Sequence, residues 1–189
     1  MIIALQGPRA VGKSTLTENI RNGNRNIVVH EGFKYTGRLF NLDDENEFYE
    51  NQRIYIRQKI QQYQQLDAAK DNLIVRGAED IYFYTCQYPK NRGFSWKVKE
   101  NIGEELKKLG RYRSDLILYL DATEKMLQIR NTKDTRNRKN LDEWMKDWYM
   151  NMRRYFSELG QTRMINTELM NKEEVYQSVI SVIANEEKL

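Results

Sequence analysis

Short apolar runs alternate along the chain with longer stretches in which apolar residues recur at helical spacing. The short runs are rich in Ile, Val and Leu, a composition typical of strands that are buried on both faces of a sheet. Because parallel strands need long crossover connections, this alternation predicts a parallel sheet with helices on both of its faces. The expected strands lie at residues 2–5, 27–30, 73–75, 116–120 and 163–165.

Three stretches between or after these runs are predicted to be helices. The first covers residues 13–21, directly after a glycine-containing segment, and the last covers residues 172–187. The longest runs from Asp44 to about Lys70 without Gly or Pro. Its apolar residues recur at spacings of seven, four and three, which indicates one helical face: they are Tyr49, Ile56, Ile60 and Tyr63.

The order of these elements predicts an α/β fold in one domain that covers residues 1–189. A chain of 189 residues is long enough for one full core and short for two independent ones. In open α/β sheets, ligands bind beyond the carboxyl ends of the strands. We therefore expect functional residues to cluster directly after each strand.

Composition excludes several classes of protein. Hydrophobic residues make up 40% of the chain and charged residues 31%, a balance typical of an ordered globular protein. Cys86 and His30 are the only residues of their kinds, so neither an internal disulfide nor a Cys/His zinc cluster can form. The first five residues are apolar, which is too short for a signal peptide or a membrane span, so we expect a cytoplasmic protein.

Charge alone gives a weak indication of the ligand. Lys and Arg outnumber Asp and Glu by 31 to 27, a net charge of +4. This excess favours the approach of a polyanionic ligand but does not by itself indicate nucleic acid. Composition therefore does not favour a nucleic-acid partner.

Residues 7–14 carry the most specific signal in the sequence. They read Gly-Pro-Arg-Ala-Val-Gly-Lys-Ser and match the phosphate-binding pattern G-x-x-x-x-G-K-[ST], between an expected strand and an expected helix. Lys13 is expected to reach the β and γ phosphates, and the Ser14 hydroxyl is the expected protein ligand of Mg²⁺. The sequence thus predicts ATP and Mg²⁺ as cofactors, bound by Gly7, Arg9, Ala10, Val11, Gly12, Lys13, Ser14 and Thr15.

Together with three weaker segments, at 75–80, 119–121 and 130–139, this loop resembles the P-loop nucleoside and nucleotide kinases. The likeness is to thymidylate-kinase-like and deoxynucleoside-kinase-like proteins, including small AAA-type kinases, and it spans most of the chain. It implies a P-loop NTPase fold with a five-stranded parallel sheet and an Arg-rich lid at about residues 130–140. Phosphoryl transfer from ATP is the activity that the resemblance implies.

The resemblance also implies an acidic residue followed by arginine after the third strand. Arg76 matches the arginine, which holds phosphate in such kinases, but the acidic position is Val75 here. The carboxylate that would assist the metal or the acceptor must then come from elsewhere, and the candidates are Glu79, Asp80 and Asp121.

Two further roles follow from the resemblance. Glu31 comes directly after the second strand, where deoxynucleoside kinases place the carboxylate that accepts a proton from the acceptor hydroxyl. In the lid, guanidinium groups would stabilise the charge of the transferring phosphoryl group; the candidates are Arg130, Arg136 and Arg138.

The sequence gives a weaker indication of which residues form the acceptor pocket. Gln52, Arg53 and Arg57 lie on the long helix that lines the acceptor site in such kinases. Residues 166–168 follow the last strand, where related kinases contact adenine, whereas Trp144 and Trp148 are expected to pack their helix onto the domain. Aromatic rings near the second and third strand ends could stack on a planar acceptor or pack in the core: they are Phe33, Tyr35, Phe40, Tyr82, Phe83 and Tyr84.

The leading hypothesis is therefore an ATP- and Mg²⁺-dependent phosphotransferase that moves the γ-phosphoryl group to a small molecule, a nucleoside or a nucleotide. Phosphotransfer to an antibiotic-type alcohol is an alternative. A nucleotide-dependent switch or ATPase without a small-molecule acceptor remains an alternative, because Val75 replaces the expected acid. A nucleic-acid-binding module built on residues 130–139 is a third. No membrane partner is expected, and a homodimer is one option for the oligomeric state.

Overall fold

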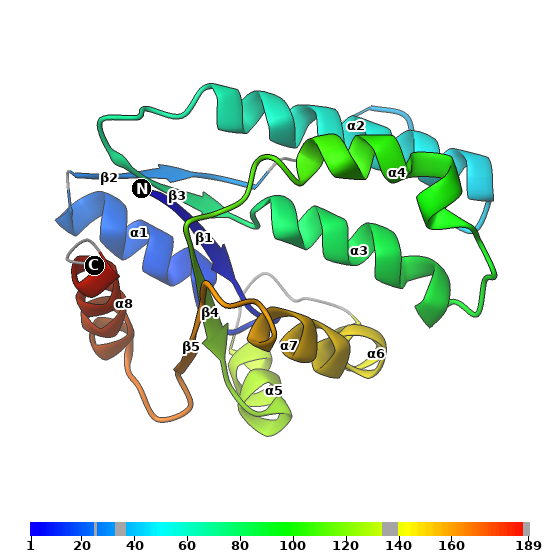
Figure 1. Cartoon of the computed structure of the whole chain (residues 1–189). Helices are drawn as coiled ribbons and strands as arrows, with labels where there is room; N and C mark the ends of the chain where they lie inside the picture. The colour runs from blue at the N-terminus through cyan, green and yellow to red at the C-terminus, as the bar shows by residue number, and fades with distance from the viewer. Residues whose placement is uncertain (25, 33–36, 134–139, 187–189) are drawn as a thin grey trace.

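Five parallel strands form the centre of the molecule (Figure 1). The computed structural model describes residues 1–24, 26–32, 37–133 and 140–186. The strands pair in the order β2-β3-β1-β4-β5, and every neighbouring pair is parallel. This confirms the α/β fold and the parallel sheet predicted from the apolar runs. The strands are β1 (Ile2–Gln6), β2 (Ile27–His30), β3 (Asp71–Val75), β4 (Leu116–Asp121) and β5 (Thr162–Asn166).

Helices cover both faces of this sheet. Figure 1 shows α1 and α8 on one side of the strands, and α2, α3, α4 and α7 on the other. The helices are α1 (Lys13–Gly23), α2 (Glu45–Gln64), α3 (Ala78–Asn91), α4 (Val98–Leu109), α5 (Glu124–Thr132), α6 (Leu141–Trp144), α7 (Met150–Ser157) and α8 (Lys172–Glu186). A π-helical turn, Met145–Tyr149, joins α6 to α7.

The long helix predicted to reach Lys70 ends at Gln64 instead. Asp67 forms a local turn in which its carboxylate accepts a hydrogen bond from the Ala69 N–H at 2.9 Å. Short polar side chains of this kind compete with helical hydrogen bonding, so the backbone leaves the helix although neither Gly nor Pro is present. At the other end, Asp44 caps α2 by accepting from the Glu47 N–H at 2.9 Å.

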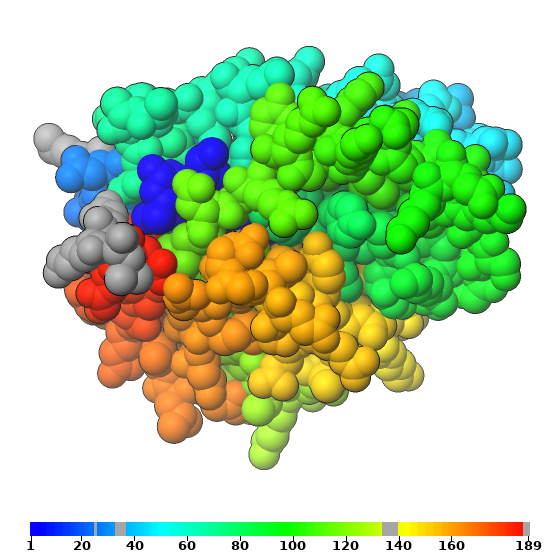
Figure 2. Space-filling model, viewed as in Figure 1, coloured from blue at the N-terminus to red at the C-terminus, as the bar shows by residue number. Residues whose placement is uncertain are grey.

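Two hydrophobic clusters hold the layers together. The larger one joins β1 and β4 to α1, α5, α7 and α8, and the smaller one packs α2, α3 and α4 against Ile74 of β3. Phe83 belongs to the larger cluster although it lies on α3, where it contacts Phe156 of α7. The orange atoms of α7 lie directly beneath the green atoms of α3 and α4 in Figure 2.

Trp144 and Trp148 pack against the domain, as the sequence predicts. The Trp144 side chain is buried and its Nε1–H donates to the Tyr84 hydroxyl at 3.3 Å. Trp148 packs on the rings of Phe83 and Tyr84. In the part of the chain that the structure describes, no helix combines the length and the apolar composition needed to cross a membrane.

Candidate functional site

The loop between β1 and α1 turns on residues with positive φ. Gly7 has φ 131° and Gly12 has φ 107°, values that L side chains rarely adopt. A Cβ atom on Gly7 would lie 2.3 Å from the carbonyl oxygen of Leu120, so only glycine fits there. Gly12 caps α1 without any side-chain hydrogen bond, which leaves the first N–H groups of the helix to a ligand. The loop therefore has the local features of a phosphate site.

The Lys13 ammonium group lies over this loop. Its Nζ donates to the carbonyl oxygens of Gly7 at 2.6 Å and Pro8 at 2.7 Å. These bonds hold the positive charge next to the backbone that would surround a phosphate. The loop is also fixed from outside, because the Arg9 guanidinium lies 5.5 Å from the centre of the Trp144 ring in α6, a cation–π contact.

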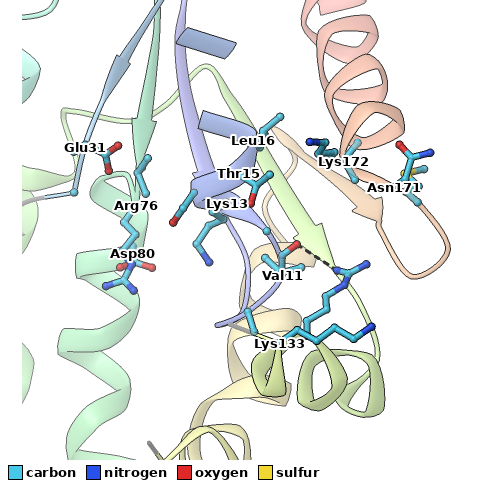
Figure 3. Close-up of a pocket in the computed structure, with 18 of the residues that line it drawn as sticks. Val11, Lys13, Thr15, Leu16, Glu31, Arg76, Asp80, Lys133, Asn171 and Lys172 are labelled. Carbon is cyan, nitrogen blue, oxygen red and sulfur yellow. Dashed lines mark hydrogen bonds between the residues drawn. The ribbon is translucent and has the colours of Figure 1, made fainter. Parts of the chain in front are cut away.

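A single cleft runs from this loop across the carboxyl ends of β2 and β3. Its volume is about 660 Å³, which is in the range of small-molecule sites. Figure 3 shows Glu31, Arg76 and Asp80 on one side of the cleft, Lys13 and Thr15 in the middle, and Asn171 and Lys172 at the far end. Residues that follow β1, β2 and β3 thus line one cleft, and those from the loop and the start of α1 are Ala10, Val11, Gly12, Lys13, Ser14 and Thr15.

Glu31 lies at the rim of the cleft, directly after β2. Its side chain is 63% exposed and forms an ion pair with Arg21 of α1. Its backbone carbonyl accepts a hydrogen bond from Gln62 Nε2 at 3.0 Å, which ties the segment to α2. The carboxylate is accessible to a molecule bound in the cleft, as a proton acceptor must be.

Arg76 lies on the same side of the cleft as Glu31, directly after β3. Its backbone has φ 62°, in the left-handed region, and its N–H donates to the Leu5 carbonyl at 3.1 Å. This turn places an exposed guanidinium group in the cleft (Figure 3). Positive φ at a non-glycine residue costs free energy, and such residues are concentrated at functional sites.

Arg130 joins three segments around the end of the cleft that holds the loop of residues 7–14. From α5, its Nη1 donates to the Val11 carbonyl at 3.3 Å and to Thr167 Oγ1 at 2.9 Å, while Nη2 donates to the Thr167 carbonyl at 2.5 Å. Burial lowers the pKa of Arg130, against the opposing effect of the Glu168 charge. The side chain lines the cleft, but all three of these hydrogen bonds go to protein groups.

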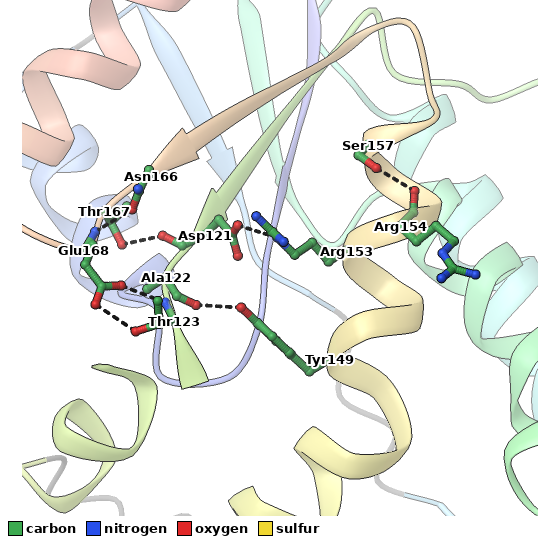
Figure 4. A network of polar contacts seen from close by, with 10 residues as sticks. All are labelled: Asp121, Ala122, Thr123, Tyr149, Arg153, Arg154, Ser157, Asn166, Thr167 and Glu168. Atoms are coloured by element: carbon green, nitrogen blue, oxygen red, sulfur yellow. Dashed lines mark hydrogen bonds and ion pairs between the residues drawn. The ribbon is translucent and has the colours of Figure 1, made fainter. Parts of the chain in front are cut away.

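The loop after β5 is fixed by a second set of hydrogen bonds (Figure 4). The Thr167 N–H and Oγ1–H both donate to the Asp121 carbonyl, at 2.8 and 3.0 Å. The Glu168 carboxylate accepts from the N–H and Oγ1–H of Thr123, both at 2.7 Å. These hydrogen bonds to Thr123 lower the pKa of Glu168. Together with Arg130, they position residues 170–172 at the edge of the cleft.

Comparison with known proteins identifies the fold but not a close relative. No protein-family model and no curated protein matches the sequence. Among solved structures, thymidylate kinase from Candida albicans matches with a TM-score of 0.70 and 13% identity, over 98% of this chain and 92% of that one. Deoxyadenosine kinase from M. mycoides with bound dATP matches with a TM-score of 0.70 and 15% identity, over 97% and 100%. A second structure of that enzyme, with products dCMP and a flexible dCDP bound, matches with a TM-score of 0.66 and 17% identity, over 100% of this chain and 98% of that one.

The chain has the fold of these nucleoside and nucleotide kinases. Each match covers almost the whole length of this chain and of the matched structure, so the expected fold class is confirmed. In this kinase fold, residues 134–139 of the expected lid, including Arg136 and Arg138, lie outside the described residues. Their role and that of Arg130 in phosphoryl transfer stay predictions.

Of the three carboxylates considered in place of an acid at Val75, one lies in the cleft. Glu79 is buried; one carboxylate oxygen accepts from the Ser114 N–H at 2.8 Å and the other from Ser114 Oγ at 3.1 Å. Asp121 forms an ion pair with Arg153 at 2.7 Å and lines a separate, smaller pocket. Asp80 is 6% exposed and lines the main cleft (Figure 3).

The environment of Asp80 is buried and rich in positive charge. Burial raises the pKa of its carboxyl group, and the charges of Arg76, Lys13 and Lys59 oppose that rise. With its amide oriented to satisfy both atoms, Gln6 donates to Asp80 Oδ1 at 3.1 Å and accepts from the Gly77 N–H at 2.8 Å. The carboxylate is thus held by the end of β1, next to the phosphate loop.

Lys59 is a site residue that the sequence reasoning missed. It lies on α2, is 3% exposed and lines the cleft, where its Nζ donates to the Arg76 carbonyl at 2.7 Å and to Gln62 Oε1 at 2.8 Å. Burial lowers its pKa from 10.5 to about 8. The signal was present in the sequence: Lys59 follows Ile56 by three positions and precedes Tyr63 by four, so it falls on the apolar face of the helix.

Gln52, Arg53 and Arg57, the candidates for the acceptor site on α2, do not line the cleft. Arg53 faces α4, where its Nε donates to Glu105 Oε1 at 2.9 Å, and Gln52 accepts from Thr85 Oγ1 at 2.9 Å. Arg57 Nε donates to a carbonyl of its own helix. The face of α2 that meets the cleft carries Tyr55 and Lys59 instead. Spacing placed the two arginines on one face but could not say what that face contacts.

Most of the aromatic residues proposed for the acceptor pocket lie elsewhere. Phe83 and Tyr84 pack against Trp148, and Phe40 lies beneath the Arg38 guanidinium. None of these three, nor Tyr82, lines the cleft, whereas Phe33 and Tyr35 are outside the described residues. His30 packs within the sheet, as expected, with Nε2 2.9 Å from Asn72 Oδ1.

The residues of the cleft fit a magnesium ion that binds together with a nucleotide. In the described parts of the chain, no group of three or more His, Cys, Asp or Glu side chains could hold a metal by itself. Mg²⁺ in nucleotide enzymes is usually bound by one or two protein groups plus substrate phosphates and water. Ser14, at the start of α1, and the Asp80 carboxylate supply oxygen atoms of the required kind in one cleft.

Proposed function

We propose that the protein is an ATP- and Mg²⁺-dependent phosphotransferase that moves the γ-phosphoryl group to a small-molecule acceptor, a nucleoside or a nucleotide. The confirmed fold and the phosphate loop support a nucleotide-binding protein, and the matched structures include deoxyadenosine kinase with bound dATP. The choice of a nucleoside or a nucleotide as the acceptor is part of the proposal.

The observation that carries the proposal is the continuity of the cleft. One space of about 660 Å³ contains the loop with Lys13 at its centre, and it also contains Glu31 and Arg76 beyond that loop. A protein that only binds or hydrolyses ATP has no need of a second charged compartment next to the terminal phosphate. A transferase needs donor and acceptor in one enclosed space, because alignment of the reacting groups supplies much of the rate enhancement.

The residues of the cleft would have different roles in phosphoryl transfer. The backbone of residues 7–14 and the start of α1 would bind the phosphates of ATP, and Lys13 would leave the carbonyls of Gly7 and Pro8 to neutralise charge on the γ-phosphoryl group. Bound Mg²⁺ would offset charge on the β and γ phosphates. Arg76 would hold an anionic oxygen of the donor or acceptor, and Glu31 would accept the proton of an acceptor hydroxyl.

Acceptor-dependent release of ADP from Mg·ATP tests this function. We expect one or more members of a panel of nucleosides, nucleoside monophosphates and amino alcohols to accelerate ADP release and to become phosphorylated. Lys13→Ala is the matched control and should lower the rate by at least about 100-fold, because it removes a charge aimed at the transferred group. Basal ADP release that no acceptor accelerates would contradict the proposal and favour a nucleotide switch or ATPase.

A further inference from the structure

The end of β3 lacks a carboxylate at the position where the related kinases carry one. Val75 is the last residue of β3 and its apolar side chain lines the cleft. Arg76 follows it with the expected guanidinium group. A metal ion bound at Ser14 would therefore receive no negative charge from the end of this strand.

Only two carboxylates line the cleft in the part of the chain that the structure describes, Glu31 and Asp80. Glu31 is at the exposed rim and is paired with Arg21. Asp80 is 6% exposed and lies on the same side of the cleft as Arg76, facing the segment that carries Lys13 (Figure 3). Of the two, Asp80 is the carboxylate that is buried next to the phosphate loop.

The fold holds Asp80 rigidly from three directions. Gln6, at the end of β1, donates to its carboxylate when the Gln6 amide is oriented so that its oxygen accepts from the Gly77 N–H. The first turn of α3 is anchored to α2, because the Ala78 N–H donates to the Tyr63 hydroxyl at 3.1 Å. Glu79 fixes the same turn to the segment before β4 through two hydrogen bonds from Ser114. A carboxylate placed in this way is preorganised for a ligand, as metal-associated groups require.

Burying a carboxylate is costly unless opposite charge compensates it. The surrounding cations are Lys13, Arg76 and Lys59, whose charges favour the ionised carboxylate. Lys13 is also the group that must move toward phosphate when a nucleotide binds, which would remove one of these charges from the carboxylate. A divalent cation arriving with the nucleotide would replace that charge.

From these observations we propose that Asp80, contributed by the first turn of α3, takes the place of the acid absent at Val75 and positions the magnesium ion that accompanies the nucleotide. The proposal rests on the proposed function, since it assumes that Mg·nucleotide binds at the phosphate loop. It assigns to this chain a metal-positioning carboxylate that comes from a helix instead of a strand end.

The factor by which a metal ion tightens nucleotide binding measures this role without catalysis. Calorimetric titration of ADP in EDTA and in Mn²⁺ gives two dissociation constants, whose ratio is the tightening factor. We expect Asp80→Asn to reduce this factor by about 10- to 100-fold, while metal-free ADP binds as well as before or better, because a negative charge has been removed. An unchanged tightening factor would overturn the proposal.

Restoring the acid at the strand end provides a sharper test. In the double variant Val75→Asp/Asp80→Asn, a carboxylate returns to the position that the related kinases use, and the Mn²⁺ effect should recover. Val75→Asn/Asp80→Asn is the matched uncharged control and should not recover it. Recovery in both double variants would show that packing, not charge, is responsible and would contradict the proposal.

The outcome also separates this inference from the proposed function. If the wild-type protein binds neither ADP nor Mn·ADP, the proposed function fails. If the wild-type protein shows the tightening and the Asp80→Asn variant shows it equally, only the role of Asp80 fails. Thermal unfolding of each variant checks that it is folded; an Asp80→Asn protein that loses metal-free ADP binding as well would point to a structural role and would overturn the metal role.

Discussion

The ionisable side chain of Lys59 is buried next to the cleft. Its Nζ is bonded to a carbonyl and to an amide oxygen, so neither hydrogen bond brings a full negative charge. Burial therefore lowers its pKa to about 8. Because the folded protein releases this proton more readily than the unfolded chain does, Lys59 makes stability depend on pH.

The sign of this dependence can be tested with Lys59→Met. Between pH 8 and 10.5 the unfolded chain binds more protons at this position than the folded protein does. As the pH increases through this range, the free energy of unfolding of the wild-type protein should therefore rise relative to that of Lys59→Met. The full lowering of the pKa corresponds to a relative gain of about 3 kcal/mol. Urea unfolding across this pH range measures it. Lys107→Met, at an exposed position of α4, is the control and should show no such trend.

Glu31 distinguishes a hydroxyl acceptor from a phosphate acceptor. If the acceptor is a hydroxyl, Glu31→Gln removes the proton acceptor and kcat should fall by about 100- to 10,000-fold. Its ion pair with Arg21 is exposed and contributes little to stability, so the variant should remain folded. Arg21→Gln, which leaves the Glu31 carboxylate in place, should keep most of the activity. A fully active Glu31→Gln enzyme on a nucleoside would exclude this role.

At the scale of elements, the end of the cleft at the phosphate loop depends on segments far apart in sequence. Arg130 of α5 binds the phosphate loop at Val11 and the loop after β5 at Thr167. Glu168 binds Thr123 at the start of α5. None of these contacts belongs to a helix or a strand ladder; they add to the backbone hydrogen bond from the Thr167 N–H to the Asp121 carbonyl at 2.8 Å.

Replacing Arg130 should loosen these segments before it affects the sheet. In Arg130→Gln we expect faster hydrogen exchange at residues 167–171 and weaker ADP binding, because charge-assisted hydrogen bonds contribute about 1.5–3 kcal/mol. Hydrogen-exchange mass spectrometry and calorimetry measure the two effects. Arg154→Gln, an exposed position on α7, is the control. Unchanged exchange in residues 167–171 would show that Arg130 does not hold this loop.

At the scale of the whole molecule, the cleft lies where the parts of the fold built on the two hydrophobic clusters meet. The phosphate loop belongs to the unit built on β1, β4, α1 and α8, whereas Lys59 and Asp80 come from helices that contribute to the smaller cluster of α2, α3 and α4. Phe83 and Phe156 pack at the boundary between these units. The same architecture occurs in kinases that share only 13–17% of their residues with this chain.

Much of this molecule could be predicted from local sequence. The five apolar runs identified the five strands of the described residues. The reason is clearest for β1 and β4, which are buried almost throughout and therefore apolar along most of their length. The pattern at residues 7–14 located the phosphate loop, since positive φ at Gly7 and Gly12 and a following helix are local requirements. The end of α2 was misplaced by six residues because the turn at Asp67 depends on a side-chain hydrogen bond.

Only the tertiary structure decided which side chains share the cleft. Spacing put Arg53 and Arg57 on one face of α2, but the position of α4 turned Arg53 toward Glu105 and left Lys59 at the cleft. Three acids were equivalent in the sequence, and the fold bound Glu79 to Ser114 and Asp121 to Arg153, leaving Asp80 beside the phosphate loop. Local sequence fixes backbone conformation, whereas contacts between distant segments depend on how whole helices pack.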